Sequence, residues 1–329
     1  MTKPNLPSST LPTSPTPRDL FEYLKHLTAK GGPEFDDYDE LTACFHSIGD
    51  LVRLRQLSYL DGLTVWWKTL GEAFSSAQTM QGWVFVKPHS YSGDFEIIEQ
   101  ISQYWKSPKE HLYRWDYYFQ EQAMSRTLRY RKGYLYDLVE GVLISHPSGE
   151  LHILNTGCGA ARDVKECLQF LNDIERASFD CLDKDKKAIA FAKKLNKDYL
   201  RQISFSTGSA FNYGFDKEYD LVWSAGGGDY LDDETFCLLF ARLLCQLKEG
   251  GELAMGSFSE NNPSRDYMEA LGWFMNHRTE GELFGLARKC GVPAEDITIE
   301  AVEGNLFLRV GKGRAEIRGD LGQSVMALG

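Results

Sequence analysis

Residues 151–168 read LHILNTGCGAARDVKECL, and this stretch decides the fold that the sequence predicts. It begins as a short apolar run (151–155) typical of a buried strand, passes through a turn of small residues, and continues as a helical pattern. Gly157 and Gly159 take the first two places of a G-x-G turn, where glycine lets the backbone approach a ligand closely. The third place of a dinucleotide fingerprint is Arg162 here, so the turn favours a ligand without a pyrophosphate.

The chain after residue 155 repeats this alternation of strand and helix patterns. Short apolar runs are separated by amphipathic stretches, and a capping-box pattern at Thr279 and Glu282 marks the start of a late helix. Only Glu303 and Gly304 separate the last two runs, as in a hairpin. The sequence therefore predicts a doubly wound, Rossmann-like α/β sheet, parallel except for a strand of a C-terminal antiparallel hairpin, with helices on both faces. The predicted strands are 151–155, 178–183, 203–207, 219–224, 251–258, 297–302 and 305–310.

The chain before this region has a different composition. Residues 1–18 are rich in proline, serine and threonine and are predicted to form a disordered arm. Residues 19–145 are mostly helical in pattern, with 111–143 predicted as one long or kinked helix, and would form a helical lid or substrate domain. The sheet domain is expected over 146–311, and a polar tail over 312–329.

The charge of the chain argues against nucleic acid as a partner. The formal net charge is −11, and the basic stretch RTLRYRKGY at 126–134 is short and surrounded by acidic residues, whereas phosphate recognition requires a basic surface. We find no apolar run long enough for a membrane span and no signal-peptide pattern. Seven scattered cysteines without a CxxC pair predict free thiols in the cytoplasm and no metal site.

Polar residues after the second and third strands complete the ligand site that the first turn suggests. In a doubly wound sheet the ligand lies at the carboxyl ends of the strands. Asp183 ends the second strand, 26 residues after Gly157, and a carboxylate there can accept hydrogen bonds from both hydroxyls of a ribose. Ser209 and Ala210 follow the third strand and are placed to border a purine ring. Arg162 is predicted to pair either with a ligand carboxylate or with a surface acid.

Five segments resemble, in order and spacing, those of class I S-adenosylmethionine-dependent methyltransferases. They are ILNTGCGAARD, CLDKDKKAIAFAKK, STGSAFNY, YDLVWSAGGGDYL and LKEGGELAMGSF, and together they span residues 150–310 approximately. The resemblance implies S-adenosylmethionine as cofactor and S-adenosylhomocysteine as product. The residues for which it implies cofactor contact are Asn155, Gly157, Cys158, Gly159, Arg162, Asp183, Lys184, Ser209, Ala210 and Ser224.

A narrower resemblance points to an acceptor. The segments YSGDFEIIEQI, CGAARD, SAGGGDYL and NPSRDYMEALGWFMNHRTEGEL are similar to bacterial extracellular-factor 3-hydroxypalmitic acid methyl ester biosynthesis proteins. This resemblance implies a carboxylic acid as acceptor and a methyl ester as product. Gly226, Gly227 and Gly228 stand where bulkier residues are expected, which predicts an opened or reshaped pocket wall.

Candidate residues for the acceptor side follow the later strands. Asp229 and Tyr230 come after the fourth strand, where the reacting atom should lie, and Asp229 is alternatively a cap for the helix at 232. Arg265 is placed to bind a substrate carboxylate, or else is an exposed arginine at the start of a helix. Tyr230 and His277 are catalytic candidates, His277 as a general base or else as a packed histidine.

A loop before the sheet domain is also predicted to reach the cofactor. In HSYSGDFE (89–96), Tyr91 and Asp94 would contact the cofactor as part of a lid, and Asp94 is a further catalytic candidate. Alternatively, Asp94 caps the helix that starts at Phe95. We expect a methyltransferase of a small-molecule acceptor, with N- or S-methylation of an amino acid, amine or thioether as the alternative within the class. A cofactor-binding sensor or partner subunit without turnover is the alternative outside it, and the oligomeric state, a homodimer included, is left open.

Overall fold

The computed structural model describes residues 11–312 and divides them into two compact units. The first unit holds the residues up to 126 together with 263–274, and the second holds 127–262 and the residues from 275 onward. The division therefore falls between 126 and 127, and not near the expected residue 145. Residues 313–329 of the predicted tail and 1–10 of the predicted arm lie outside the described residues.

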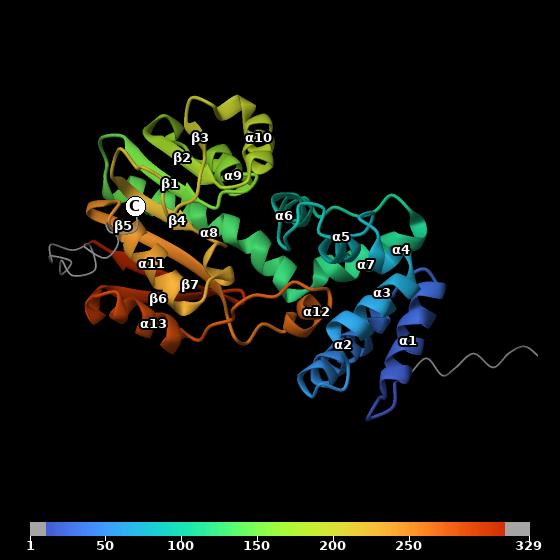
Figure 1. Cartoon of the computed structure of the whole chain (residues 1–329). Coiled ribbons are helices and arrows are strands. Elements are labelled where there is room, and N and C mark those ends of the chain that lie inside the picture. The colour runs from blue at the N-terminus through green and yellow to red at the C-terminus, as the bar shows by residue number, and fades with distance from the viewer. Residues whose placement is uncertain (1–10, 313–329) are drawn as a thin grey trace, which may run out of the picture. The chain divides into compact units, whose positions relative to one another are not determined.

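The second unit is built on one seven-stranded sheet with the strand order β3-β2-β1-β4-β5-β7-β6 (Figure 1). β7 runs antiparallel to both of its neighbours, and the other neighbouring strands are parallel. The order reverses between β1 and β4, and doubly wound sheets bind their ligands at the carboxyl ends of the strands at such a reversal. The predicted fold class is thereby confirmed. The strands are β1 (Leu151–Thr156), β2 (Ala177–Asp183), β3 (Ile203–Thr207), β4 (Tyr219–Ser224), β5 (Leu247–Phe258), β6 (Ile297–Val302) and β7 (Asn305–Gly311).

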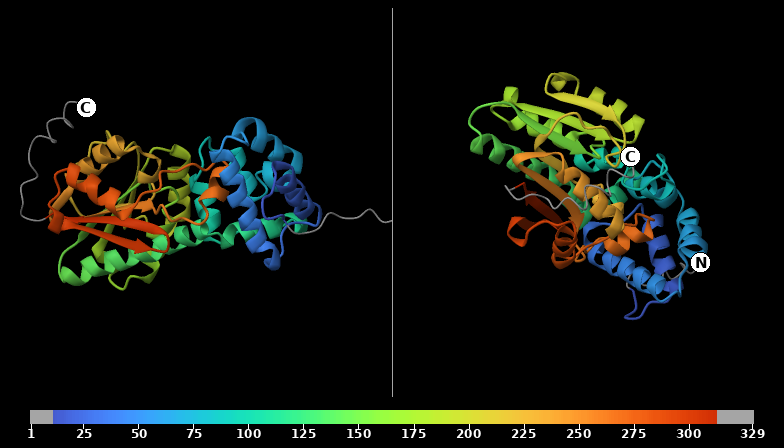
Figure 2. Two further views of the ribbon diagram at one scale, coloured as in Figure 1. Left: turned by 90° about the horizontal axis from the view of Figure 1, so that it is seen from below. Right: turned by 60° about the vertical axis from the view of Figure 1, so that its left-hand side comes forward.

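Helices cover both faces of this sheet. α8 (Ala123–Ser145), α9 (Arg162–Phe170) and α10 (Lys186–Leu195) pack on one face, and α11 (Asp233–Leu244) and α13 (Glu280–Lys289) pack on the other. The left view of Figure 2 shows the red β6–β7 hairpin between the green α8 and the orange α13. The predicted capping box at the start of α13 is present. Short helices of the second unit are η3 (Ile174–Arg176), η4 (Lys197–Tyr199), η5 (Gly228–Tyr230) and η6 (Ala294–Asp296).

The one long or kinked helix predicted over 111–143 is two helices in the structure, separated at Gln122. α7 (Glu110–Glu121) ends at Gln122, whose ψ of 143° is extended, and α8 begins at the next residue. The break needs no proline because side chains satisfy the freed carbonyl groups of α7. Ser125 Oγ donates to Phe119 O at 2.7 Å, and Gln122 Nε2 donates to Tyr118 O at 3.3 Å.

The first unit is all helical and closes around buried aromatic side chains. Trp67 and Phe74 stack with ring centroids 4.7 Å apart, and both are fully buried. The first helix begins at Pro17 with Thr16 as its cap, so the predicted disordered arm does not extend to residue 18. The helices are α1 (Pro17–Ala29), η1 (Phe35–Asp37), α2 (Tyr38–Arg53), the π-helix η2 (Tyr59–Leu63), α3 (Thr64–Leu70), α4 (Glu72–Ser75), α5 (Met80–Val86), α6 (Phe95–Ser102), α7 and α12 (Arg265–Ala270).

A buried carboxyl group ties three parts of the first unit together. The Asp116 side chain has no exposed surface. One of its oxygens accepts the backbone N–H of Met80 at 2.7 Å, and the other accepts that of Ser107 at 2.7 Å. Burial raises the pKa of Asp116 to about 7, although the two hydrogen bonds act in the opposite direction.

Residues 263–274, which we call the crossing segment, lie between β5 and α13 in the chain but pack in the first unit. Trp67 Nε1 donates to Ala270 O at 2.8 Å. The buried Tyr267 hydroxyl donates to Gln81 Oε1 at 2.9 Å. The helix α12 within this segment is therefore part of the core of the first unit.

Candidate active site

The turn after β1 has the left-handed backbone that its glycines permit. Gly157 and Gly159 have φ angles of +64° and +53°, and Ala161 has a φ of +51°. The N–H groups of Gly157 and Cys158 both donate to Leu182 O, at 2.8 and 3.2 Å, so the turn is held against the end of β2. A Cβ atom built on Gly157 would meet no heavy atom within 4 Å. The backbone at this position thus faces open space, which fits the close approach of a ligand.

Asp183 at the end of β2 supports this turn. Its Oδ2 accepts the N–H of Gly159 at 2.8 Å, and its Oδ1 accepts the N–H of Asp185 at 2.8 Å. Burial raises the pKa of Asp183, while the two N–H donors partly compensate. Each carboxylate oxygen has two lone pairs, so both can still accept a hydroxyl. These residues fit the adenosyl ribose that the sequence predicts for this position.

Asp163 was not anticipated from the sequence. It is the second residue of α9, and burial raises its pKa. Its carboxylate accepts the N–H of Val164 at 2.9 Å, Trp223 Nε1 at 2.9 Å and Asn155 Nδ2 at 3.3 Å. It thereby joins the ends of β1 and β4 to α9. The side-chain amide of Asn155, a predicted cofactor contact, is used in this cluster.

The loop after β3 lies against the end of β2. Gly208 N–H donates to the backbone O of Asp183 at 2.9 Å, and Arg242 Nε donates to Ala210 O at 2.9 Å. Ser209 and Ala210 are half-buried there. This puts the predicted purine-binding residues beside the predicted ribose acceptor.

The remaining predicted cofactor residues differ in exposure. Lys184 is exposed, Arg162 is half-buried at the start of α9, and Ser224 is buried at the end of β4. Cys158 is buried beneath the turn, where a contact with the Cys181 thiol together with burial raises its pKa. A neutral buried thiol is unreactive, and contact of Cys158 with the cofactor stays a prediction.

Residues 225–231, which we call the acceptor-side loop, follow β4. A Cβ atom on Gly228 would lie 3.0 Å from both Met255 Cε and Phe236 Cε2. A Cβ atom on Gly226 would lie 3.1 Å from Arg131 Nη1. These two glycines therefore allow close packing, and an opened or reshaped pocket wall stays a prediction.

Asp229 in this loop is buried in an ion pair. Its Oδ2 lies 3.4 Å from Arg131 Nη2, and its Oδ1 accepts the N–H of Phe258 at 2.7 Å. Burial raises the pKa of Asp229 to about 6, and the cation of Arg131 opposes this effect. The alternative that Asp229 caps α11 is wrong, because Asp232 is the cap and accepts the N–H of Thr235.

The three catalytic candidates lie in different surroundings. Tyr230 is 47% exposed at the surface of the acceptor-side loop. The two ring nitrogens of His277 lie 3.2 Å from Met275 O and 3.1 Å from Asn262 Nδ2. These contacts hold the imidazole ring of His277 in the second unit, and its role as a general base stays a prediction.

Asp94, the third candidate, lies in the first unit. Its Oδ1 accepts the N–H groups of Glu96 and Ile97 at 2.9 Å, and its Oδ2 accepts Trp83 Nε1 at 2.9 Å. Asp94 is thus the N-cap of α6, and burial raises its pKa. Tyr91 is half-buried in the same loop. Contact of either residue with the cofactor stays a prediction.

Arg265 also lies in the first unit, at the start of α12. Its side chain is 47% exposed, and its Nε donates to Glu269 at 2.7 Å. This matches the alternative of an exposed arginine at a helix start, and binding of a substrate carboxylate by Arg265 stays a prediction.

The described part of the chain lacks two other kinds of feature. Residues 11–312 contain no cluster of three or more His, Cys, Asp or Glu side chains that could hold a metal ion. Among the same residues, no helix combines the length and apolar character that crossing a membrane would require.

Comparisons with known proteins place the second unit in a class. Residues 153–251 match a family model described as a methyltransferase domain. A possible exported protein from Bordetella parapertussis has a similar structure, with a TM-score of 0.55, 17% identity, and coverage of 67% of this chain and 79% of that chain. No curated protein sequence matches the chain.

Two solved methyltransferase structures match less closely. An O-methyltransferase family protein from Burkholderia thailandensis matches with a TM-score of 0.45 and 13% identity, covering 59% of this chain and 60% of that chain. Magnesium protoporphyrin IX methyltransferase from Synechocystis PCC 6803, with bound SAH, matches with a TM-score of 0.44 and 14% identity, covering 57% of this chain and 87% of that chain.

The family match and the strand order identify residues 153–251 as a class I methyltransferase domain. S-adenosylmethionine, the cofactor that the sequence predicts, is consistent with this match to a methyltransferase domain.

Proposed function

We propose that the second unit transfers a methyl group to the carboxylate of a small-molecule acceptor and thereby forms a methyl ester. The main support for cofactor binding is the Asp183 carboxylate at the carboxyl edge of β2. It accepts the N–H groups of Gly159 and Asp185, and both of its oxygens can accept a further hydrogen bond. The acceptor half is supported by the sequence resemblance to methyl ester biosynthesis proteins.

The chain's own residues would hold the cofactor at three places. The backbone of Gly157 faces open space for the amino acid portion, Asp183 would accept the ribose hydroxyls, and Ser209 with Ala210 would border the purine. Arg162 would pair with the cofactor carboxylate. When bound, S-adenosylmethionine supplies a methyl group on a positively charged sulfur, which a carboxylate oxygen can take without losing a proton.

A carboxylate acceptor agrees with the groups around the acceptor-side loop. A carboxylic acid is already ionised near pH 7, so no general base is needed. Both oxygens of Asp229 are engaged by Phe258 and Arg131. Tyr230 is the exposed aromatic residue of this loop and would contact the acceptor. An amine acceptor would instead need a residue that takes a proton.

The test is transfer of a labelled methyl group. The full chain is incubated with methyl-tritiated S-adenosylmethionine and a bacterial metabolite extract, and the products are treated with mild base. We expect base to release the label as volatile methanol, because hydroxide cleaves an ester at its acyl carbon. Label that stays in base-stable products would indicate N- or S-methylation and overturn the carboxylate assignment. Binding of S-adenosylhomocysteine without any transfer would indicate a sensor or partner subunit.

A further inference from the structure

Arg131 on α8 is a buried arginine whose hydrogen-bond donors are only partly used within the second unit. Its side chain is 10% exposed, and its Cζ atom lies 5.0 Å from the ring centroid of Phe258. Its Nη2 donates to Asn305 Oδ1 at 3.1 Å and lies 3.4 Å from Asp229 Oδ2. Its Nε makes no hydrogen bond with the described part of the chain. Because a guanidinium group has five N–H donors, Arg131 keeps donor capacity for a ligand.

The Nη1 atom of Arg131 lies beside the acceptor-side loop at Gly226. A Cβ atom built on Gly226 would lie 3.1 Å from Nη1, and it would meet no other heavy atom of the described residues within 4 Å, adjacent residues in the chain aside. A Cβ atom on Gly227 would meet only Ser224 Oγ, at 3.8 Å, on the same terms. Residues 225–227 are half-buried. The two glycines therefore border open space that has a guanidinium and a hydroxyl at its edge.

The charges around this space leave Arg131 able to attract an anion. Burial raises the pKa of Asp229, and the charges of Arg131 and Arg278 both oppose this effect. Arg278 also pairs with the exposed Asp233 at 3.3 Å, and the charge of Asp163 acts on Arg131. Asp229 meets Arg131 at Nη2, and their distance of 3.4 Å is long for an ion pair. An anion beside Nη1 would meet the guanidinium directly, with Asp229 at its other nitrogen.

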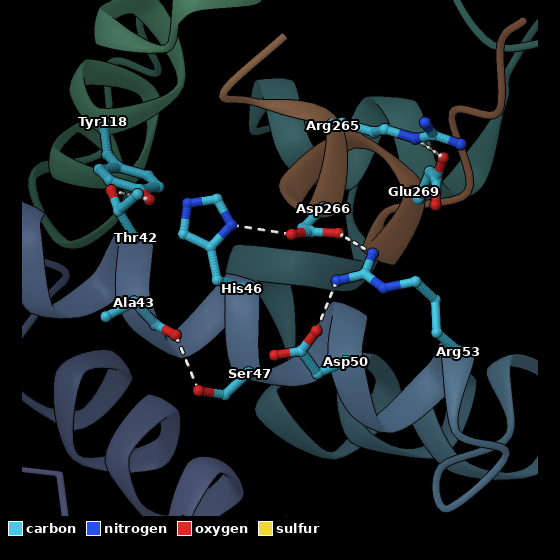
Figure 3. Close-up of polar contacts among 10 residues, drawn as sticks. All are labelled: Thr42, Ala43, His46, Ser47, Asp50, Arg53, Tyr118, Arg265, Asp266 and Glu269. Atoms are coloured by element: carbon cyan, nitrogen blue, oxygen red, sulfur yellow. Dashed lines mark hydrogen bonds and ion pairs between the residues drawn. The ribbon is translucent and has the colours of Figure 1, made fainter. Parts of the chain in front are cut away.

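Two arginines of the first unit provide a contrast, because both have carboxylate partners (Figure 3). Arg265 Nε donates to Glu269 at 2.7 Å, and Arg53 Nη2 donates to Asp50 at 2.8 Å. Arg265 is the residue that the sequence predicts for a substrate carboxylate, and its side chain is 47% exposed. Arg131 is more deeply buried and has unused donors, so it suits this role better.

We propose that Arg131 binds the carboxylate of the methyl acceptor through Nη1, beside Gly226 and Ser224. This inference rests on the proposed function in assigning the carboxylate to the acceptor. Because Nη2 is engaged by Asp229 and Asn305, Nη1 would hold one carboxylate oxygen and leave the other to take the methyl group. A guanidinium holds an anion without taking a proton from it, which suits an acceptor that is already ionised.

A carboxylate introduced at residue 226 tests whether Nη1 receives an anion, and this test needs no acceptor. Gly226→Asp places a carboxylate against Nη1, and Gly226→Asn is the matched control of the same shape without the charge. The φ of Gly226 is not left-handed, so the backbone permits both side chains. At low salt we expect Gly226→Asp to melt about 2–4 °C or more above Gly226→Asn. Equal melting temperatures would overturn the proposal.

A double-mutant cycle assigns this difference to Arg131. In an Arg131→Gln background the two variants at residue 226 should melt at the same temperature, because the cation that separates them is gone. A difference that persists there would come from another group and would overturn the proposal. The comparison at residue 226 leaves Arg131 in place, so it decides the matter even if Arg131→Gln does not fold.

The cofactor also has a carboxylate, and two ligands separate it from that of the acceptor. S-adenosylhomocysteine contains this carboxylate and 5′-methylthioadenosine lacks it. In calorimetric titrations of Arg131→Gln we expect both Kd values to stay within about twofold of the wild type. A loss of about tenfold or more for S-adenosylhomocysteine alone would assign Arg131 to the cofactor and overturn the proposal. Gly226→Asp compared with Gly226→Asn gives the same information through charge repulsion.

Methyl transfer to the metabolite extract tests the acceptor directly. Base-released label should fall by about tenfold or more in Arg131→Gln, through a higher KM for the acceptor. Lys132→Gln is the matched control on the same helix, because Lys132 pairs with Glu166 at 2.8 Å, and it should transfer as the wild type does. Normal transfer in Arg131→Gln, or a loss in Arg265→Gln alone, would overturn the proposal. Label only in base-stable products would defeat the proposed function, whereas the melting comparison would still show whether Arg131 receives an anion.

Discussion

Replacement of Asp183 by asparagine tests the cofactor site most directly. In the wild type the two carboxylate oxygens hold the N–H groups of Gly159 and Asp185, each at 2.8 Å. Asparagine keeps one acceptor oxygen and places an NH₂ group where the other oxygen was. If that NH₂ group faces a backbone N–H, the N–H loses its acceptor. If it faces a ribose hydroxyl, the hydroxyl can no longer donate to this position.

The size of the effect follows from these contacts. A hydrogen bond to a charged group contributes about 1.5–3 kcal/mol, and a buried polar group left without a partner costs about 1–3 kcal/mol. The affinity for S-adenosylhomocysteine should therefore fall by about 1–3 kcal/mol, which is about 5- to 150-fold in Kd. Because the ribose is the shared contact, adenosine should lose affinity by a similar factor.

Isothermal titration calorimetry on Asp183→Asn, well below its melting temperature, measures both affinities. Asp180→Asn is the control, because Asp180 also lies on β2 but pairs with Lys217 and Tyr219. The control should bind S-adenosylhomocysteine as the wild type does. If Asp183→Asn melts at a lower temperature and yet binds the ligand within twofold of wild type, Asp183 only supports the turn and the ribose assignment is refuted.

Three further predictions concern stability. The folded pKa of Asp116 is about 7, well above that of an unfolded aspartate, so the folded state keeps this proton as the pH rises from 4 to 7. The free energy of unfolding, measured with urea, should therefore fall over that range by up to about 4 kcal/mol from this group. Asp116→Asn should flatten this pH profile. Gly228→Ala should lower the free energy of unfolding by about 1–3 kcal/mol through overpacking. Gly141 faces open space in α8, so Gly141→Ala should raise the free energy of unfolding by about 0.5–1 kcal/mol. Thermal melting of the two variants measures both effects. Asp163→Asn should destabilise the second unit by about 1–3 kcal/mol, seen as a lower melting temperature in calorimetry, since one of its donors loses its acceptor.

The sheet was predictable because its signals are local. Strands 203–207, 219–224 and 297–302 have the predicted bounds, since each is an apolar or alternating run ended by a turn residue. β5 starts four residues earlier than expected, at Leu247, because pairing with Tyr219 extends it across two glycines. That extension depends on a neighbouring strand, which local patterns do not record.

The crossing segment shows what local patterns leave out. An amphipathic helix between two strands normally packs on the sheet that those strands belong to, yet α12 buries Tyr267 among aromatic residues of the first unit. The apolar spacing of a helix indicates that one face is buried, but it does not indicate which element packs on that face. The same holds for Arg131, which belongs to a basic stretch that reads as surface charge but is 8% exposed beside Asp229.

Polar residues at the junctions of elements are ambiguous for a physical reason. A helix start and a ligand site both require a carboxylate beside unpaired N–H groups, and the sequence pattern of the two is the same. Asp94 and Asp183 illustrate this, since both accept two backbone N–H groups. The two carboxylates differ in the lone pairs that remain. At Asp94, one lone pair accepts a hydrogen bond from Trp83 Nε1. Asp183 lies at the carboxyl edge of the sheet, beside a backbone at Gly157 that faces open space. A carboxylate at a ligand site therefore differs from a helix cap in the lone pairs that remain after its hydrogen bonds within the protein are formed. These lone pairs can be counted only once the donors from distant segments are known.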